Sequence, residues 1–534
     1  MTAALKRDSK DVLIQPLPAM LGVQQSARGQ CWTERLEPNR LHLATAIAQA
    51  HGLPDLLGRI LAVRGADLQT AERYLDPSLK TLMPDPASLQ DMARAAERMA
   101  AAITRGETIG IFGDYDVDGA SCVALIERFL RDHETTRGQS GDPKCLTYIP
   151  DRLTEGYGPS PQALTGLVEE GARLILTVDC GTAGEKAIAA ANDAGADVIV
   201  LDHHQAGEAL PPAFAVVNPN RQDDLSGQGH LAAAGIVFLF LVATAAALRR
   251  LDAYEHQDAP DLLGLLDLVA LATVCDMVPL KDANRAFIAK GLKVLRLRHN
   301  AGLRALADEA RLTEAPSTYS LGFVLGPRIN AGGRVGASGL GARLLATDDD
   351  SEAAPIAARL EALNAQRKAI EAGMLDGATA MADTALAENP GAPLLFLGDA
   401  DWHKGLVGLV AGRLTDRFQR PSFIMTLDAD GMATGSARSI PSVDLGLVVR
   451  DAVEEGLFVK GGGHAMAAGF SLDWDKREAA EAFLTERLSD SVASSSASRT
   501  LGLDGVLSAR GATHELIDLL ERAGPYGPGH PRPR

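Results

Sequence analysis

The chain has 534 residues, more than one hydrophobic core usually supports, and we expect roughly three to four domains of about 150 residues each. It is 46% hydrophobic and 23% charged, which excludes a largely disordered or collagen-like protein. The net charge of −17 excludes a general polyanion-binding tail, and the 4% aromatic content offers few surfaces for base stacking, so any contact with nucleic acid is expected to be local.

The N-terminal residues and the cysteines indicate the compartment. Residues 1–23 carry several charges and lack the apolar stretch of a signal peptide. The five cysteines are odd in number and none stands in a CxxC pair, so neither a disulfide framework nor a zinc site is indicated. We therefore expect a reducing compartment and a cytoplasmic protein.

The first half of the chain predicts a helical region followed by an α/β domain. Residues 1–105 contain apolar helical patterns and form the predicted N-terminal region. In residues 106–348, short apolar runs then alternate with helical patterns, which is typical of a parallel α/β sheet. The predicted strands are 108–112, 173–178, 197–201 and 213–217.

Residues 231–248 form an uncharged stretch long enough to cross a membrane. Many of these residues are alanine, which adds little insertion energy, and motifs on both sides require one continuous domain. We therefore predict a buried helix and no association with a membrane.

The second half predicts a connector and a smaller domain. Residues 349–388 are rich in Ala, Glu and Leu and predict one long helix or a helix pair between two domains. A second, smaller α/β domain is expected over 389–488, and the Ser-rich residues 489–500 predict a flexible linker. Residues 501–534 form the last segment.

Three aspartates follow the first predicted strand at alternate positions, in the segment GDYDVDG: Asp114, Asp116 and Asp118. Clustered carboxylates repel one another, and a hard divalent cation offsets this repulsion. The spacing resembles the opening of an EF-hand calcium loop, but that loop needs an acid at its twelfth position, where this chain has Leu125. A different kind of metal site is therefore favoured.

Further acidic and imidazole side chains follow apolar runs. Asp179, Asp202, His203 and His204 come after predicted strands, and Asp276 follows the apolar run 268–274, which is also expected to form a strand. Each residue alone is more often a turn or helix cap, but the carboxyl ends of parallel strands share one edge, so we expect the set to converge. Asp and His without Cys suit Mn²⁺ or Mg²⁺, and a pair of such ions is a standard device for phosphoester hydrolysis.

Four segments resemble, in order, the motifs of the DHH phosphoesterase superfamily. They are GDYDVDG (113–119), TVDCGT (177–182), LDHHQ (201–205) and TVCDMVPL (273–280). Others resemble the RecJ branch of single-strand-specific 5′-to-3′ DNA exonucleases: GPRINAGGRVG (326–336), WHKGLVGLVAGRL (402–414), GSARSI (435–440) and GGGHAMAAG (461–469). The resemblance covers about residues 50–534, with Cys275 and Gly332 where the family commonly has Ala.

This resemblance implies a fold and a metal centre. The fold is α/β, with a DHH phosphoesterase domain built on a parallel sheet and a smaller DHH-associated domain joined to it by a long helix. Two divalent cations, Mn²⁺ or Mg²⁺, would be held by Asp114, Asp116, Asp118, Asp179, His203 and Asp276. Asp179 would bridge the two ions, and Asp114 would bind them directly or support the other ligands.

The resemblance also implies residues that meet the substrate. His204 would contact the scissile phosphate, and Arg328 and His403 would meet phosphate oxygens across the cleft. These three are the implied catalytic residues beyond the metal ligands.

Other residues would bind the strand itself. Arg152, Ser436 and Arg438 would hold its 5′ end, because guanidinium groups match phosphate geometry, although an exposed arginine is more often a solvated charge. His464 in the segment 461–469 would add a donor to DNA phosphate. That segment matches no nucleotide-binding loop, and a plain tight turn is the alternative.

The implied activity is that of a metal-dependent 5′-to-3′ exonuclease that hydrolyses single-stranded DNA to 5′ mononucleotides in DNA repair and recombination. Candidate partners are single-stranded DNA, a single-strand-binding protein and a helicase. One alternative is a DHH phosphodiesterase acting on short oligonucleotides or cyclic dinucleotides, which the long N-terminal region argues against. Another is a non-catalytic DNA-binding scaffold, which the intact Asp and His set argues against.

Residues 501–534 resemble only the opening of the OB-like domain that follows in this branch, and 525–533 resembles its PFGxGNPxP segment. An OB barrel needs about five strands, so we predict an incomplete OB-like segment in a chain shorter than its relatives. Such a chain would keep its metal centre but bind long single strands weakly and with strong salt dependence.

Overall fold

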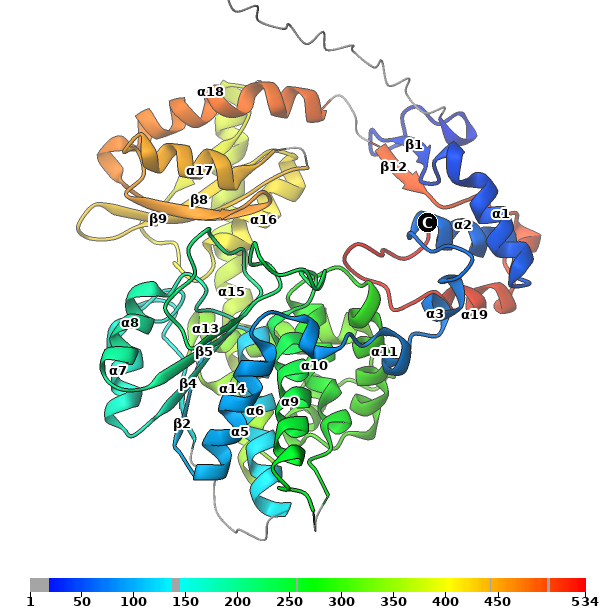
Figure 1. Ribbon diagram of the computed structural model, residues 1–534. Coiled ribbons are helices and arrows are strands. Elements are labelled where there is room, and N and C mark those ends of the chain that lie inside the picture. Colours follow the sequence, from blue (N-terminus) through cyan, green and yellow to red (C-terminus); the bar gives the residue numbers. More distant parts are fainter. Residues whose placement is uncertain (1–18, 137–144, 256–257, 442, 497–499) are drawn as a thin grey trace, which may run out of the picture. The chain divides into compact units, whose positions relative to one another are not determined.

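The computed structural model describes residues 19–136, 145–255, 258–441, 443–496 and 500–534 (Figure 1). By its contacts the chain divides into two compact units. The larger unit is Asp76–Val492 with Pro525–Pro531, and the smaller unit comprises Met1–Leu75, Ala493–Gly524 and Arg532–Arg534. The C-terminal residues therefore contribute to both units.

A five-stranded parallel sheet forms the centre of the first domain of the larger unit, in the order β3-β2-β4-β5-β6. Its strands are β2 (Ile109–Gly113), β3 (Cys145–Tyr148), β4 (Leu174–Val178), β5 (Asp197–Leu201) and β6 (Ala215–Val217). Four of them coincide with predicted strands, which confirms the parallel α/β sheet. The sequence does not predict β3, because this short strand has no continuous apolar run and is only partly buried.

Helices cover both faces of this sheet, as its buried strands require. One face is covered by α5 (Met92–Arg105), α6 (Val117–Thr136), α9 (Ala233–Arg250) and α10 (Leu266–Cys275). The other face is covered by α7 (Pro161–Glu169) and α8 (Glu185–Asp193). Ile111 of β2 belongs to the first core and Phe112 to the second, which is the alternation expected of a strand.

Helix α9 is the apolar stretch that resembles a membrane span. It is the one helix within the described ranges that is long and apolar enough to cross a membrane, and 72% of it is buried inside the domain. It packs against α5, α6 and α10. The predicted buried helix at this position is therefore confirmed.

Further helices complete the first domain and lead out of it. They are α4 (Leu79–Leu82), α11 (Asp282–Leu297), α12 (Ala301–Glu309), a π-helix (Ser320–Leu325), α13 (Gly326–Val335) and α14 (Leu340–Ala346). Helix α15 (Asp350–Glu388) then runs for 39 residues, and the Asp349 side chain caps it by accepting a hydrogen bond from the Ser351 amide at 2.8 Å. The connector is thus one long helix rather than a helix pair.

The second domain contains a mixed five-stranded sheet in the order β10-β11-β9-β8-β7, in which only β7 and β8 are parallel. Its strands are β7 (Leu395–Gly398), β8 (Ser422–Leu427), β9 (Met432–Arg438), β10 (Lys460–His464) and β11 (Ala467–Asp473). Its helices are α16 (Val407–Phe418), α17 (Leu445–Glu454) and α18 (Arg477–Ser496). The glycine-rich segment 461–469 is therefore a β-hairpin, not only a turn.

The expected Ser-rich linker needs a correction. Helix α18 continues to Ser496, so residues 489–496 are helical. The Ser489 hydroxyl donates to the Thr485 carbonyl at 2.6 Å, which shows how a serine can satisfy its side chain within a helix. Residues 497–499 lie outside the described part of the chain.

The smaller unit joins segments from both ends of the sequence. Strand β1 (Cys31–Glu34) pairs in parallel with β12 (Thr500–Leu503). The helices of this unit are α1 (Leu41–Ala50), α2 (Asp55–Val63), α3 (Ala71–Leu75) and α19 (His514–Arg522). An ion pair between Arg35 and Asp504, 2.7 Å long, lies at the end of the two strands. The OB-like character of 501–534 stays a prediction.

Candidate active site

The predicted metal ligands converge at the carboxyl edge of the parallel sheet. Asp114 and Asp116 follow β2, Asp179 follows β4, and His203 follows β5, so four ligands reach this edge by the topology of the sheet. Asp276 arrives differently, because the apolar run before it is helix α10 rather than a strand. The expectation that Asp276 stands at a strand end is therefore wrong, because a short apolar run does not distinguish a buried strand from a buried helix.

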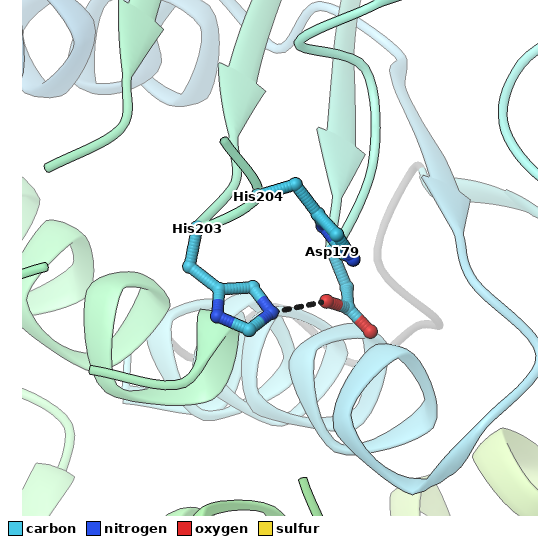
Figure 2. A group of neighbouring side chains, drawn as sticks. All are labelled: Asp179, His203 and His204. Carbon is cyan, nitrogen blue, oxygen red and sulfur yellow. Dashed lines mark ion pairs between the residues drawn. The ribbon is translucent and has the colours of Figure 1, made fainter. Parts of the chain in front are cut away.

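The ligand atoms of these residues form three overlapping groups, each within 4.8 Å. The groups are Asp179–His203–His204, Asp118–His203–Asp276 and Asp114–Asp116–Asp179. His203 Nε2 lies 3.3 Å from Asp179 Oδ1 and 3.7 Å from Asp276 Oδ2. Figure 2 marks the contact between His203 and Asp179 with a dashed line. The structure therefore brings all six proposed metal ligands and His204 into one cluster.

Four buried atoms of this cluster have no hydrogen-bond partner among the described residues: Asp114 Oδ1, Asp179 Oδ1, His203 Nε2 and Asp276 Oδ2. Buried polar atoms are nearly always paired, since leaving them unpaired is costly. A divalent cation would satisfy these atoms, and carboxylate oxygens with one imidazole nitrogen are donors that suit Mn²⁺ or Mg²⁺. The residues present therefore fit such ions.

The electrostatics of the cluster also point to a cation. Burial, reinforced by the neighbouring carboxylates, raises the pKa of Asp114, Asp118, Asp179 and Asp276 above the usual value of 3.8. Burial, together with the charge of His204, lowers the pKa of His203 to about 4, so its imidazole is neutral at pH 7 and can offer a lone pair. Bound cations would favour the ionised carboxylates that this site needs.

Asp118 has a second role in the fold. Its carboxylate accepts hydrogen bonds from the amides of Ala233 at 2.7 Å and Ala234 at 2.8 Å, the first residues of α9. Negative charge at a helix N-terminus is favourable because amides there lack partners in the helix. The same carboxylate therefore fixes the core helix and faces His203.

Asp179 has a left-handed backbone conformation, with φ of 59°. Aspartate and asparagine tolerate this conformation better than most residues other than glycine. Strained residues of this kind cluster at functional sites, and here the conformation belongs to one of the two residues, Asp179 and His203, that are each shared by two of the three groups.

A hydrogen-bond network that the sequence did not predict holds His204. Asp202 Oδ1 lies 2.7 Å from His204 Nδ1, and its other oxygen accepts from the Thr182 amide at 3.0 Å. Burial opposes protonation of His204, but the hydrogen bond and charge of Asp202 outweigh it and raise its pKa above 6.5. The Tyr157 hydroxyl lies 3.0 Å from His204 Nδ1 and donates to the Asp179 carbonyl at 3.1 Å.

Two asparagines after β6 support the same loop. Asn218 Nδ2 donates to the His204 carbonyl at 2.8 Å, and Asn220 Nδ2 donates to the His203 carbonyl at 2.5 Å. Both follow a strand of the parallel sheet, so the argument used for the aspartates could have identified them. The sequence analysis applied that argument to acidic and imidazole groups only.

The proposed 5′-end residues gather beside a cavity of about 560 Å³. Arg152 and Ser436 line it together with Tyr115, Tyr157 and Lys404. The Arg152 guanidinium lies 5.0 Å from the centroid of the Tyr115 ring, a cation–π distance. The sequence analysis did not identify Lys404, although it lies in the segment WHKG.

Arg438 lies close to this group. Its Nη2 and the Ser436 hydroxyl both approach Gly408 near the start of α16, within 3.1 and 3.3 Å of where a Cβ would stand. Burial, followed by the charge of Arg152, lowers the pKa of Arg438. The structure therefore brings Arg152, Ser436 and Arg438 together, whereas the exposed His464 on β10 does not line the cavity.

The other two predicted catalytic residues are engaged with the protein. Arg328 forms an ion pair with Glu361 of α15 and donates to the Val324 carbonyl at 2.7 Å. His403 Nδ1 accepts from the Gly405 amide at 3.1 Å, and burial lowers the pKa of His403. Their roles at the phosphate stay predictions.

A further cation in this region is Arg334, which the sequence analysis quoted in GPRINAGGRVG but did not assign. Burial lowers its pKa to about 9, aided by the charges of Arg152, Arg367 and Arg438 and opposed by Asp116. It donates to the Gly405 carbonyl at 3.2 Å. Arg334 thus brings positive charge within electrostatic range of Asp116.

Comparisons with known proteins agree with this arrangement. The family model for the DHH family, N-terminal domain, matches residues 108–273, and the DHHA1 domain model matches residues 391–490. The single-stranded-DNA-specific exonuclease RecJ of Dickeya dadantii is 36% identical over 493 residues, which cover 90% of this chain and 83% of that protein.

Solved structures give the same result. The chain matches RecJ from Thermus thermophilus in complex with Mn²⁺ with a TM-score of 0.72 and 30% identity, over 93% of this chain and 68% of that chain. It matches the Mg²⁺ complex of the same protein with a TM-score of 0.69 and 27% identity, over 93% of this chain and 66% of that chain. Both the first domain and the second therefore have a structural counterpart.

Proposed function

The chain belongs to the RecJ family of single-stranded-DNA-specific exonucleases, and from this premise we propose how its site binds and cleaves a strand. It is a metal-dependent exonuclease that acts on single-stranded DNA. The observation that carries the proposal is the cluster of buried carboxylate and imidazole atoms without hydrogen-bond partners among the described residues.

Two divalent cations, Mn²⁺ or Mg²⁺, are the cofactors. We assign one ion to Asp114, Asp116 and Asp179, and the other to Asp118, His203 and Asp276. The two sets meet where Asp179 of the first set lies next to His203 of the second. When bound, such a pair activates the attacking water and stabilises the attacking and leaving oxygens of an in-line displacement. The protein fixes the positions of the ligand atoms relative to one another, and the burial of His203 keeps its imidazole neutral.

His204 is the proposed contact to the scissile phosphate. Asp202 holds its ring and keeps it a proton donor, because a protonated imidazole next to a carboxylate is favoured. A cationic donor of this kind stabilises the negative charge that grows on the phosphoryl oxygens during displacement. Tyr157 helps to orient the same ring, since its hydroxyl also lies 3.0 Å from His204 Nδ1.

The cavity beside the metal cluster is the proposed 5′-end pocket. Arg152, Arg438 and Ser436 supply donors for a terminal phosphate, and Lys404 adds a further cation. A strand whose 5′ phosphate is held there presents the next phosphodiester to the metals, so cleavage proceeds 5′ to 3′ and releases 5′ mononucleotides. Arg328, His403 and His464 are proposed as further phosphate contacts along the strand.

In the cell, this activity suits DNA repair and recombination, with a cytoplasmic location. We propose a helicase and a single-strand-binding protein as partners, since an exonuclease restricted to single strands depends on proteins that open duplexes and keep strands free of structure.

Digestion of end-labelled strands tests the proposal. With Mn²⁺, a single strand labelled at its 5′ end should release labelled mononucleotide at once, whereas a 3′-labelled strand should shorten progressively. Cleavage confined to dinucleotides or cyclic dinucleotides would favour a small-substrate phosphodiesterase. Strand binding without any hydrolysis would favour a scaffold.

A further inference from the structure

A tight turn near the end of the chain, residues Pro525–Pro531, is an ordered part of the larger unit. The amide of Gly527 donates to the His530 carbonyl, and the reverse bond has the same length of 3.0 Å. Pro528 and Gly529, whose φ is 70°, take the two central positions, which is the pattern of a type II turn. Tyr526 and His530 are each only 7% exposed, so the turn is embedded in the domain.

Three carbonyls of this turn accept hydrogen bonds from three residues of the first domain. The bonds are Leu280 N to Pro528 O at 3.1 Å, Thr318 Oγ1 to Tyr526 O at 2.8 Å, and Arg285 Nη1 to Pro525 O at 3.3 Å. Gly527 lies so close to Leu280 that a Cβ there would be 2.6 Å from its side chain. The contact is therefore made by the backbone of the turn.

The donors of these bonds belong to the segments after Asp276 and before the π-helix: Leu280 and Arg285 follow Asp276, and Thr318 stands two residues before the π-helix. Leu280 ends the loop that carries Asp276 and is completely buried, and within the loop Met277 has a left-handed φ of 62°. On the other side of Asp276, the Cys275 thiol donates to the Leu321 carbonyl of the π-helix at 3.5 Å, three residues after Thr318. A left-handed residue other than glycine persists only where its surroundings hold it.

We propose that the turn Pro525–Pro531, called the clasp below, positions Asp276 as a ligand and thereby sets the affinity of one of the two cation positions. This inference rests on the proposed function, in which Asp276 binds a metal with Asp118 and His203. None of the three clasp donors belongs to the Asp114–Asp116–Asp179 group, whose residues follow β2 and β4. The clasp therefore acts on one cation position and not on the other.

Asp276 needs such help from outside its own side chain. Its Oδ2 has no hydrogen-bond partner among the residues described, so no neighbouring donor fixes the carboxylate before a cation arrives. Groups that orient a metal ligand commonly change metal affinity without touching the metal. Here the clasp bonds the backbone amide of Leu280, four residues after the ligand, and the Cys275 side chain ties the residue before the ligand to the π-helix that follows Thr318.

Two variants loosen the clasp, and each has a matched control. Gly529→Ala places a side chain on a left-handed residue that faces Pro279 at 3.5 Å, and Gly456→Ala does the same at φ of 69° in open space on the second domain. Thr318→Val removes the hydroxyl that donates to Tyr526, and Thr165→Val removes a similar bond to the Pro161 carbonyl on α7. Valine is nearly isosteric with threonine, so the two threonine variants should fold. They keep the test possible if Gly529→Ala does not fold.

The measurement is a Mn²⁺ titration of the full chain followed by electron paramagnetic resonance, which counts free ions and needs no catalysis. In both clasp variants one Mn²⁺ should bind about tenfold more weakly, while the second ion and both controls keep wild-type affinity. Raising the Mn²⁺ concentration should then restore the hydrolysis rate.

A third variant, Asp276→Asn, distinguishes a failure of the clasp inference from a failure of the proposed ligand set. If it weakens one Mn²⁺ while the clasp variants bind both ions like wild type, or lose both equally, the clasp does not position Asp276 and the inference is wrong. If Asp276→Asn itself leaves both affinities unchanged, the proposed ligand set is wrong instead.

Discussion

The two sheets of the larger unit place their functional side chains by different means. In the parallel sheet, strands β2, β4 and β5 all end at one edge, so the residues that follow them meet there whatever lies between. In the mixed sheet, β9 runs opposite to both of its neighbours, β8 and β11, and Ser436 and Arg438 lie on β9 rather than after it. Strand direction positions four of the proposed metal ligands, Asp114, Asp116, Asp179 and His203, whereas pairing register positions the proposed end-binding residues Ser436 and Arg438.

The two arrangements should fail differently when a side chain is lost. In our proposal, a residue at the parallel edge shares its cation with ligands from several elements, so its loss should disable the chemistry. A residue on β9 is proposed to hold one end of the substrate, so its loss should alter selectivity more than the chemical step. The substitutions below separate these effects, and the first should have the largest effect.

Asp179→Asn should abolish hydrolysis, with a loss of roughly three orders of magnitude or more, because it removes a charged ligand shared by two groups. Asparagine tolerates the left-handed φ of 59°, so the fold should survive, whereas alanine would add backbone strain. Single-turnover hydrolysis with Mn²⁺ measures the loss, and thermal unfolding serves as the control. Turnover near that of wild type would remove Asp179 from the metal site.

Asp202→Asn should reduce the rate by about 10- to 100-fold, since it removes the partner that orients His204. In the wild-type chain Asp202 raises the pKa of His204, so the substitution lowers that pKa and His204 loses its proton at a lower pH. The alkaline limb of the pH–rate profile should therefore move to lower pH. An unchanged profile would show that His204 does not act as a proton-bearing group.

Arg438→Ala should reduce the preference for a 5′ phosphate over a 5′ hydroxyl by about tenfold, the expected value of a charge-assisted bond to phosphate. Affinity for an internal stretch of strand should change less. Comparing kcat/KM on the two kinds of substrate measures the effect, with Arg413→Ala, an exposed residue of α16, as the matched control. Equal losses on both substrates would place Arg438 outside the end pocket.

The smallest effect concerns Asp267, which lies in the first turn of α10, the helix that ends one residue before Asp276. Burial raises the pKa of Asp267 to about 6, above the value of an unfolded chain. Its ionisation therefore costs up to about 3 kcal/mol of stability as the pH rises from 4 to 7. Asp267→Asn should remove this contribution to the pH dependence of stability, as thermal unfolding between pH 5 and 7.5 would show. The affinity for Mn²⁺ should not change.

The sequence predicts most of the metal cluster because each ligand follows an apolar run and the edge of a parallel sheet collects such residues. It places Asp202 at this edge without predicting its bond to His204, and it does not predict Asn218 or Tyr157, because these residues act through bonds to other side chains and to backbone carbonyls. Those bonds exist only once the strands are aligned. The sequence pattern therefore predicts the proposed ligands, but it does not predict the hydrogen bonds that hold them in place.

The fold shows the same division. Four strands of the parallel sheet and the buried helix α9 follow from continuous apolar runs. The run before Asp276 forms a helix, and the serines of 489–496 continue α18, because in both places the surrounding packing outweighs local composition. Strand β3 is recognisable only by its pairing with β2.

Helix α15 has a consequence for how this chain can change in length. Its 39 residues form one continuous helix, braced by a buried ion pair between Arg367 and Glu371 at 2.5 Å. One inserted residue would turn everything beyond it by about 100° and shift it by about 1.5 Å, which a surface loop would absorb but a helix transmits. Insertions and deletions there must come in near-whole turns to keep the faces of the helix in phase, so α15 should tolerate substitutions far better than changes in length.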